Sequence, residues 1–197
     1  MLHGRRVSPL AIDLHHVHRR SVTSLFSNLV TRPTGRAIRT GVESQITEME
    51  CDDTVCLSVL DFTQVRVLDY SCADEIVAKL LLRFAGEERP SEVFFVVRGL
   101  QEHHEEAVEA VLERHRLLLV VEDEDGAYRL MGTPDPLQRA VWETLVRLER
   151  AGPGQVGRET GVSDDAAAAA LAALCAGRVA VPHSDGTVSP LSFLLRS

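Results

Sequence analysis

A serine at position 71 is the residue whose type and surroundings best suit regulated chemistry. The stretch 68–75 reads L-D-Y-S-C-A-D-E, so Asp69 lies two positions before Ser71, and Asp74 and Glu75 lie three and four positions after it. Phosphorylation of a serine adds about −1.5 to −2 charges at neutral pH. Beside these carboxylates, the added charge would repel a partner docked on the same loop. The stretch therefore raises the question whether Ser71 is a chemical switch, although its neighbouring carboxylates would oppose a phosphate there.

The same serine also suits a structural role as the cap of a helix. Serine is a preferred N-cap residue, and the acidic Asp74 three positions later approximates a capping box. Such a cap contributes about 0.5 to 2 kcal/mol and needs neither a partner nor a reaction. Both interpretations of Ser71 stay open at this point, and in either case we expect the loop to be a contact surface.

No catalytic signature accompanies this serine. The sequence has no glycine-rich phosphate loop after an apolar strand, no G-x-S-x-G or H-E-x-x-H motif, and no cysteine with a local histidine signature. These patterns mark the commonest nucleophilic, metal-dependent and nucleotide-dependent sites. We therefore expect a protein that is not an enzyme and that uses no cofactor.

Histidines gather in H-H-V-H-R-R (15–20) and in H-H-E-E (103–106). Adjacent helical side chains diverge by about 100 degrees, so neighbouring histidines do not face one ion. The pairs with better spacing are His15 with His18 and His103 with Glu106. Because no second cluster of matching type accompanies them, we expect solvated side chains and no metal site.

The charge of the chain is unevenly distributed. Residues 1–50 hold seven arginines and four acids, residues 51–135 hold eight basic and nineteen acidic side chains, and residues 136–197 hold six of each, which gives a formal net charge of −8. A nucleic-acid-binding protein normally gathers lysine and arginine to neutralise phosphates. The acidic middle segment would repel them, so DNA is not the partner we favour.

The chain shows no sign of a membrane span or an export signal. It has no run of about 18 apolar residues, and its first residues, M-L-H-G-R-R-V-S-P-L, lack the apolar stretch of a secretory signal. We therefore expect a cytoplasmic protein. Its cysteines, Cys51, Cys56, Cys72 and Cys175, form no C-x-x-C pair, so we expect reduced thiols.

Hydrophobic periodicity predicts helices in the N-terminal part. Val22, Leu25, Phe26 and Leu29 have helical spacing after a Ser21 cap. A second helix is expected from about Thr34, and its inner residues are Ile38, Val42 and Ile46. Arg36 and Arg39 lie on another side of that helix, and this basic face is either solvated, which we favour, or docks something acidic. We expect the two helices to form a hairpin, a helical extension over residues 1–50.

The middle of the chain alternates strands and helices. Apolar runs predict strands at 56–62 and 91–99 and a pair of strands within 117–132 that turns at Asp125-Gly126. Helical patterns cover 73–84, closed by Gly86, and 103–115. This alternation predicts an α/β domain over 51–134, with a largely parallel or mixed sheet covered by helices.

After T-P-D-P (133–136), the pattern becomes helical. Helices are expected at 137–150, at 155–160 and after a Ser163 cap, followed by two short strands around Asp185-Gly186. Helices followed by a hairpin are typical of a winged helix-turn-helix domain, here over 135–197.

The presumed recognition helix of that domain is poorly suited to DNA. It reads S-D-D-A-A-A-A-A-L-A-A-L-C-A-G-R and offers no base-reading side chain before Arg178. Its alanines instead permit close packing, so we expect a winged helix that binds protein or dimerises. The alternative is a DNA-binding regulator whose backbone contacts come from Arg139, Arg147, Arg158 and Arg178.

The run V-L-D-F-T-Q-V-R-V-L-D-Y-S-C-A-D-E-I-V-A-K-L (59–80) resembles the central signature of STAS domains, the family of anti-sigma-factor antagonists. Leu60, Asp61 and Phe62 match the end of the family's strand, and Asp69 matches the loop aspartate. Ser71 stands where antagonists carry the serine that an anti-sigma kinase phosphorylates. The resemblance covers about residues 51–132, and Cys72-Ala73 replaces the usual Gly-Leu.

The resemblance implies a regulatory protein that binds an anti-sigma factor or a histidine-kinase-like ATPase. The residues implied in partner binding are Asp69, Tyr70, Ser71, Cys72, Asp74, Glu75 and Lys79, and phosphorylation of Ser71 would weaken the contact. The alternatives are the DNA-binding regulator, in which the STAS-like part senses or dimerises, and an adaptor with an inert Ser71. A homodimer is compatible with each of them.

Overall fold

The computed structural model describes residues 17–49, 55–86 and 89–196. Within these residues, five strands form one sheet in the order of the chain: β1 (Val17–Leu29), β2 (Val55–Leu68), β3 (Val93–Arg98), β4 (Leu118–Glu122) and β5 (Tyr128–Gly132). Neighbouring strands from β1 to β4 are parallel, and β5 is antiparallel to β4. The expected α/β fold with a mixed sheet is confirmed.

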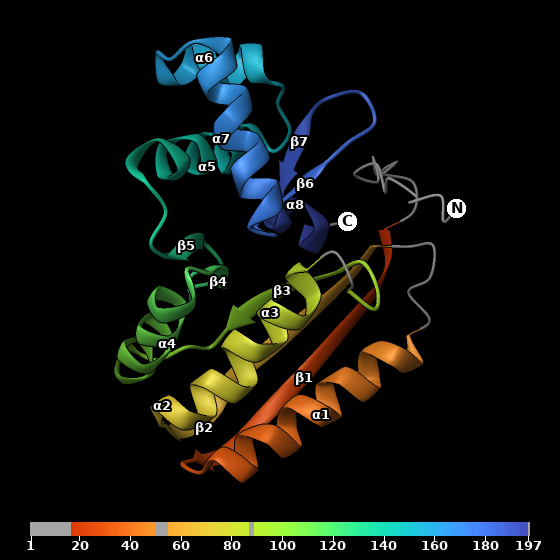
Figure 1. Cartoon of the computed structure of the whole chain (residues 1–197), viewed down its shortest axis with the longest axis vertical. Coiled ribbons are helices and arrows are strands. Elements are labelled where there is room, and N and C mark those ends of the chain that lie inside the picture. Colours follow the sequence, from red (N-terminus) through yellow and green to blue (C-terminus); the bar gives the residue numbers. More distant parts are fainter. Residues whose placement is uncertain (1–16, 50–54, 87–88, 197) are drawn as a thin grey trace, which may run out of the picture.

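Helices connect the parallel strands. They are α1 (Arg32–Glu48), a continuous segment made of α2 (Tyr70–Ala73), the π-helical turn η2 (Asp74–Ala78) and α3 (Lys79–Ala85), and finally α4 (Glu102–His115). When parallel strands follow one another in chain order, crossovers of one handedness place their helices on one face of the sheet. Figure 1 accordingly shows α1, α3 and α4 grouped together, apart from the C-terminal helices.

The helix expected over residues 21–30 is wrong, because this segment is the edge strand β1 and pairs in parallel with β2. Leu25 and Leu29 are buried, and a spacing of four suits a strand as well as a helix. Register shifts between Ser24 and Phe26 and between Ser27 and Asn28 interrupt the two-residue alternation that would have revealed the strand. Within the described residues, 17–29 therefore belong to the sheet and not to a helical extension.

The second N-terminal helix is confirmed as α1. Val42 and Ile46 are buried, and Ile38 packs against the same core. Thr31 caps the helix by accepting a hydrogen bond from the backbone N–H of Thr34, at 3.3 Å. The expected helical hairpin does not form, since the element before α1 is a strand.

The described C-terminal residues contain α5 (Pro136–Leu148), α6 (Pro153–Thr160), α7 (Asp164–Ala176), the strands β6 (Ala180–Pro182) and β7 (Val188–Pro190), and α8 (Leu191–Arg196). β6 and β7 form an antiparallel hairpin. The expected helices and hairpin are confirmed, and so is the Ser163 cap, which accepts a hydrogen bond from Ala166. No sequence pattern predicted α8.

The sheet is buried on both faces, each against a different group of helices. Alternate residues of β3 show this: Phe95 and Val97 lie in a core shared with α1, α3 and α4, whereas Phe94 and Val96 lie in a core shared with α5 and α7. Trp142 of α5 is buried in the second core, and its indole N–H donates to the carbonyl of Val179 at 3.3 Å. The C-terminal helices thus cover the face of the sheet that the crossover helices leave open.

Two further expectations concern membranes and thiols. None of the helices in the described ranges is both long enough and apolar enough to cross a bilayer. The expectation of reduced thiols is wrong for Cys56, which takes part in a disulfide. Cys72 and Cys175 are free.

Candidate functional site

The turn after β2 presents Asp69 as the cap of the following helix. β2 ends at Leu68, and the backbone of Asp69 is extended before the chain becomes helical at Tyr70. The Asp69 carboxylate accepts the backbone N–H of Cys72 at 2.8 Å and the hydroxyl of Ser71 at 2.9 Å. The interpretation of Ser71 as the cap is therefore wrong. Aspartate takes this role because it is the last residue with extended backbone, whereas Ser71 is already helical.

Ser71 lies at the surface, next to an exposed aromatic side chain. The serine is half-buried, and Tyr70 beside it is 38% exposed. Val67 and Val30 flank the paired residues Leu68 and Leu29, and are 45% and 46% exposed. We call the group Val30, Val67, Asp69, Tyr70 and Ser71 the Asp69 surface. It combines apolar contact area with a modifiable hydroxyl, which is what a regulated protein contact needs.

The acidic pair that follows Ser71 lies inside the protein. Asp74 is 7% exposed and Glu75 is fully buried. Buried carboxylates require partners, and three cationic side chains and the imidazole of His115 supply them. The ion pairs are Arg32–Asp74 and Arg32–Glu75 at 3.2 Å, Arg39–Glu75 at 3.4 Å, Lys79–Glu75 at 2.5 Å, Lys79–Asp74 at 3.8 Å and His115–Asp74 at 2.9 Å.

These pairs lower the pKa of both carboxyl groups. Burial by itself raises the pKa of Asp74, but hydrogen bonds from His115 and Arg32 outweigh it. Burial also raises the pKa of Glu75, and the hydrogen bond and charge of Lys79 more than offset that effect. Both acids therefore stay ionised and join α1, η2, α3 and α4 electrostatically.

The residues that the STAS resemblance implies in partner binding differ in their burial. Asp69, Tyr70, Ser71 and Lys79 reach the surface. Asp74 and Glu75 are committed to internal ion pairs, and Cys72 is buried with its thiol 3.0 Å from the carbonyl of Thr31. Direct contact with a partner does not fit the burial of these last three residues. Their role is to hold the helix that carries Ser71.

A close contact between helices fixes the position of that helix. A Cβ atom added at Gly35 of α1 would lie 2.9 Å from the Cβ of Glu75 and 3.1 Å from the Cα of Cys72. Only glycine lets the two backbones approach this closely. The approach also brings Arg32 and Arg39 to the buried acids, so the solvated role expected for Arg39 is wrong, whereas Arg36 is exposed.

Sequence reasoning missed Arg32, Gly35 and His115 as parts of this site. Arg32 and Gly35 lie about forty residues before Glu75, and His115 lies forty residues after it. The available signal was the acidic pair inside an otherwise apolar helix face, which needs cations from elsewhere. The π-helical turn η2, which begins at Asp74, gave no sequence signal that we can identify.

Most arginines considered for DNA contact are engaged within the protein. Arg139 donates to the carbonyl of Leu130, Arg147 pairs with Glu159, and Arg178 pairs with Glu92 and lies over the ring of Phe94. Of these four, Arg139 and Arg158 form no ion pair in the described ranges, and both are exposed. The exposed first turn of α7 carries Asp164 and Asp165, which would repel phosphates.

The histidine clusters provide no metal site in the described part of the chain. The Nε2 atom of His103 lies 2.9 Å from the backbone carbonyl of Arg66, and Glu106 is exposed. Where the structure describes the chain, no group of three or more histidine, cysteine, aspartate or glutamate side chains is placed to hold an ion. His15 and the side chain of His18 lie outside the described residues.

Comparison with known proteins adds no relative. No protein-family model and no curated protein sequence matches this chain. The functional argument therefore depends on the site itself.

Proposed function

We propose that this protein is a non-enzymatic regulatory protein that binds a signalling partner through the Asp69 surface. The resemblance of residues 59–80 to STAS domains makes the partner an anti-sigma factor or a histidine-kinase-like ATPase. Two features support this proposal. A strand-to-helix turn presents the serine at the surface next to the exposed Tyr70, and Val30 and Val67, near the ends of the strands that lead to the turn, are exposed as well.

The observation that carries the proposal is the hydrogen bond from Ser71 to the Asp69 carboxylate. This bond requires the proton of the serine hydroxyl. A phosphoserine has no such proton and places about −1.5 to −2 charges against the carboxylate. The repulsion would displace Asp69 from the backbone N–H of Cys72 and reshape the surface that the partner contacts. Phosphorylation of Ser71 would thereby release the partner.

The experiment has two steps. The purified chain is incubated with host lysate and ATP, and mass spectrometry determines whether Ser71 carries phosphate, with Ser71→Ala as the blank. A partner retained by the unmodified chain is then titrated against Ser71→Ala, Ser71→Glu and Ser44→Glu. Ser44 is exposed on α1, so its glutamate adds charge away from the Asp69 surface.

The switch requires a specific pattern of affinities. Ser71→Ala and Ser44→Glu should bind like the unmodified chain, and Ser71→Glu should bind at least about tenfold more weakly, which is about 1.4 kcal/mol. Equal affinities of Ser71→Glu and Ser71→Ala would overturn the switch. Binding that survives Tyr70→Ser together with Val67→Ser would overturn the Asp69 surface as the contact.

We further propose that the C-terminal part is a winged-helix module that contacts protein and does not read DNA. The order of α5, α6 and α7 before the β6–β7 hairpin supports the first half of this statement. The contacts that Arg139, Arg147 and Arg178 make with other residues of the chain support the second half. A gel-shift series at rising salt tests it, since a DNA complex should form at low salt and weaken steeply as salt rises.

A further inference from the structure

A hollow of about 500 Å³ lies between the sheet and the C-terminal helices. Its walls include Phe94 of β3 and Ala168, Leu171 and Ala172 of α7. This volume falls within the range of about 300 to 1,000 Å³ that is typical of small-molecule sites. Sites at the junction of two structural units are common among them.

The polar side of the hollow carries an excess of positive charge. Arg89, Arg178 and Glu92 line it, and both guanidinium groups pair with the one Glu92 carboxylate. The Nε atom of Arg178 is buried and has no hydrogen-bond partner in the described part of the chain. This atom is sealed from the hollow, so the positive charge that a ligand would meet comes from the two guanidinium groups that share one carboxylate. An anionic group on a ligand would balance the second charge.

The rest of the lining offers no second anion. Burial raises the pKa of the Cys175 thiol to about 12, so this side chain stays neutral and acts as an apolar wall. Arg178 lies 4.0 Å from the centre of the Phe94 ring, which joins the charged and the apolar parts of the hollow. The described residues therefore favour a ligand that is apolar over most of its length and carries one negative charge.

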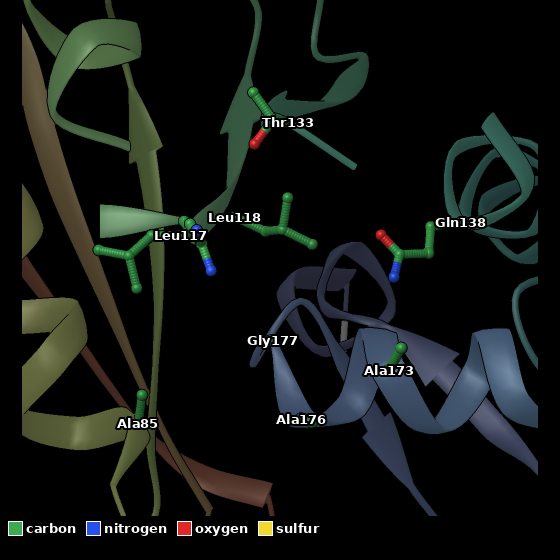
Figure 2. A pocket seen from close by; sticks show the side chains of 9 residues that line it. Ala85, Leu117, Leu118, Thr133, Gln138, Ala173, Ala176 and Gly177 are labelled. Carbon is green, nitrogen blue, oxygen red and sulfur yellow. The ribbon is translucent and has the colours of Figure 1, made fainter. Parts of the chain in front are cut away.

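A neighbouring hollow of about 520 Å³ lacks these features. Figure 2 shows Leu117 and Leu118 on one side of it and Ala173 and Gly177 of the C-terminal part on the other. Its only charged lining residue in the described ranges is the exposed Arg116, and no buried donor there lacks a partner. We therefore assign a ligand to the first hollow alone.

We propose that this hollow binds a small organic carboxylate with an apolar body. Arg89 and Arg178 would neutralise the carboxylate, and Phe94, Ala168 and Ala172 would contact the body. The alanines matter because larger side chains on this side of α7 would fill the space. The site is separate from the Asp69 surface, so this proposal does not depend on the protein partner proposed above.

The test compares three ligands of equal chain length by isothermal titration calorimetry: decanoate, decanol and decylammonium, each below its micelle concentration. Decanoate should bind with one-to-one stoichiometry, decanol should bind about tenfold more weakly, and decylammonium should not bind. The tenfold difference corresponds to about 1.4 kcal/mol and reflects the charged hydrogen bond that decanol cannot make. Failure of decanoate to bind, or equal affinity for all three ligands, would overturn the proposal.

Matched variants locate the site on α7. Ala172→Leu fills the hollow and should weaken decanoate binding at least about tenfold. Ala169→Leu makes the same change at an exposed position of the same helix that does not line the hollow, and should leave the affinity unchanged. Equal loss in both variants would show that decanoate binds elsewhere.

A second variant keeps the test informative if Ala172→Leu folds poorly. Arg89→Gln removes one of the cations and should weaken decanoate binding about tenfold while leaving the binding of decanol unchanged. Circular dichroism identifies variants that are folded. An unchanged affinity of folded Arg89→Gln for decanoate would exclude Arg89 as a carboxylate partner and contradict the proposed site.

Discussion

One oxygen of the Asp69 carboxylate accepts both the Ser71 hydroxyl, at 2.9 Å, and the backbone N–H of Cys72, at 2.8 Å. The bond that begins the helix and the bond that would be lost on phosphorylation therefore share an acceptor. A chemical change at Ser71 acts on the stability of the helix start as well as on its charge.

The cap can be tested by replacing the acceptor. Asp69→Ala should lower the free energy of unfolding by about 0.5 to 2 kcal/mol, because the backbone N–H of Cys72 loses its partner. Asp69→Asn keeps a capping oxygen and should lose less. Urea denaturation followed by circular dichroism measures both, and an Asp69→Ala variant as stable as the parent would contradict the cap.

The contact between α1 and the helix after β2 can be tested with two glycines of α1. Gly35→Ala places a methyl group against Glu75 and Cys72, and should destabilise the protein by about 1 to 3 kcal/mol. Gly41→Ala is the matched control, since its methyl group would meet no described atom within 4 Å. It should stabilise the helix by about 0.5 to 1 kcal/mol. The same sign of change in both variants would argue against the close approach.

The buried acids should dominate the response to charge removal. Glu75→Gln leaves Arg32, Arg39 and Lys79 without their shared counter-ion, and should cost about 3 to 5 kcal/mol of unfolding free energy. The control Glu159→Gln breaks an exposed pair with Arg147 and should cost less than about 1 kcal/mol. Comparable losses in chemical denaturation would mean that Glu75 is not held as described.

The same acids predict the direction of the pH dependence. The pKa values of Asp74 and Glu75 are lowered in the folded protein, so their stabilisation is complete above the unfolded pKa values of about 4 and is lost as the pH falls through the folded values. The unfolding free energy should therefore decrease as the pH drops below about 4. Glu75→Gln should show a shallower decrease in urea titrations at stepped pH, and an identical slope would contradict this origin.

The contact between the sheet and the C-terminal part depends on the shape of Arg178. Its guanidinium donates to Glu92 and to the carbonyl of Val93, and it lies over Phe94. Lysine cannot reproduce this planar set of contacts, so Arg178→Lys should lower the unfolding free energy by about 1 to 2 kcal/mol. Arg158→Lys, at an exposed position, is the control and should change it by less than about 0.5 kcal/mol. Equal effects would contradict the described contacts.

The sequence predicted those helices and strands whose hydrophobic pattern keeps a single period, or stays continuously apolar, along the whole element. The apolar runs around Val59 and Val96 and the amphipathic helix around Val111 were read correctly because each repeats without interruption. β1 was missed because its irregular register removes the alternation of a strand. A cap at Ser71 was one of two open interpretations of the sequence, and it is wrong because the backbone angles make Asp69 the cap, although serine and aspartate have similar capping propensity.

The composition of the site was less predictable than the elements. Its exposed residues follow one another in the sequence, so a local motif was enough to find Asp69, Tyr70 and Ser71. The partners of Glu75 come from α1, and the reach of Arg39 depends on how closely two helices approach at Gly35. Such contacts are set by tertiary packing, which propensity and spacing do not contain.

The arrangement of the sheet has a consequence for how the chain can be divided. The first core encloses only one side of the strands, and Leu57, Phe94, Val96, Val120 and Leu130 are shielded by residues that follow position 136. A fragment that stops at the T-P-D-P segment would expose these side chains to water as one contiguous apolar surface. The two parts of this protein therefore depend on each other, and the first part, expressed without the second, would aggregate.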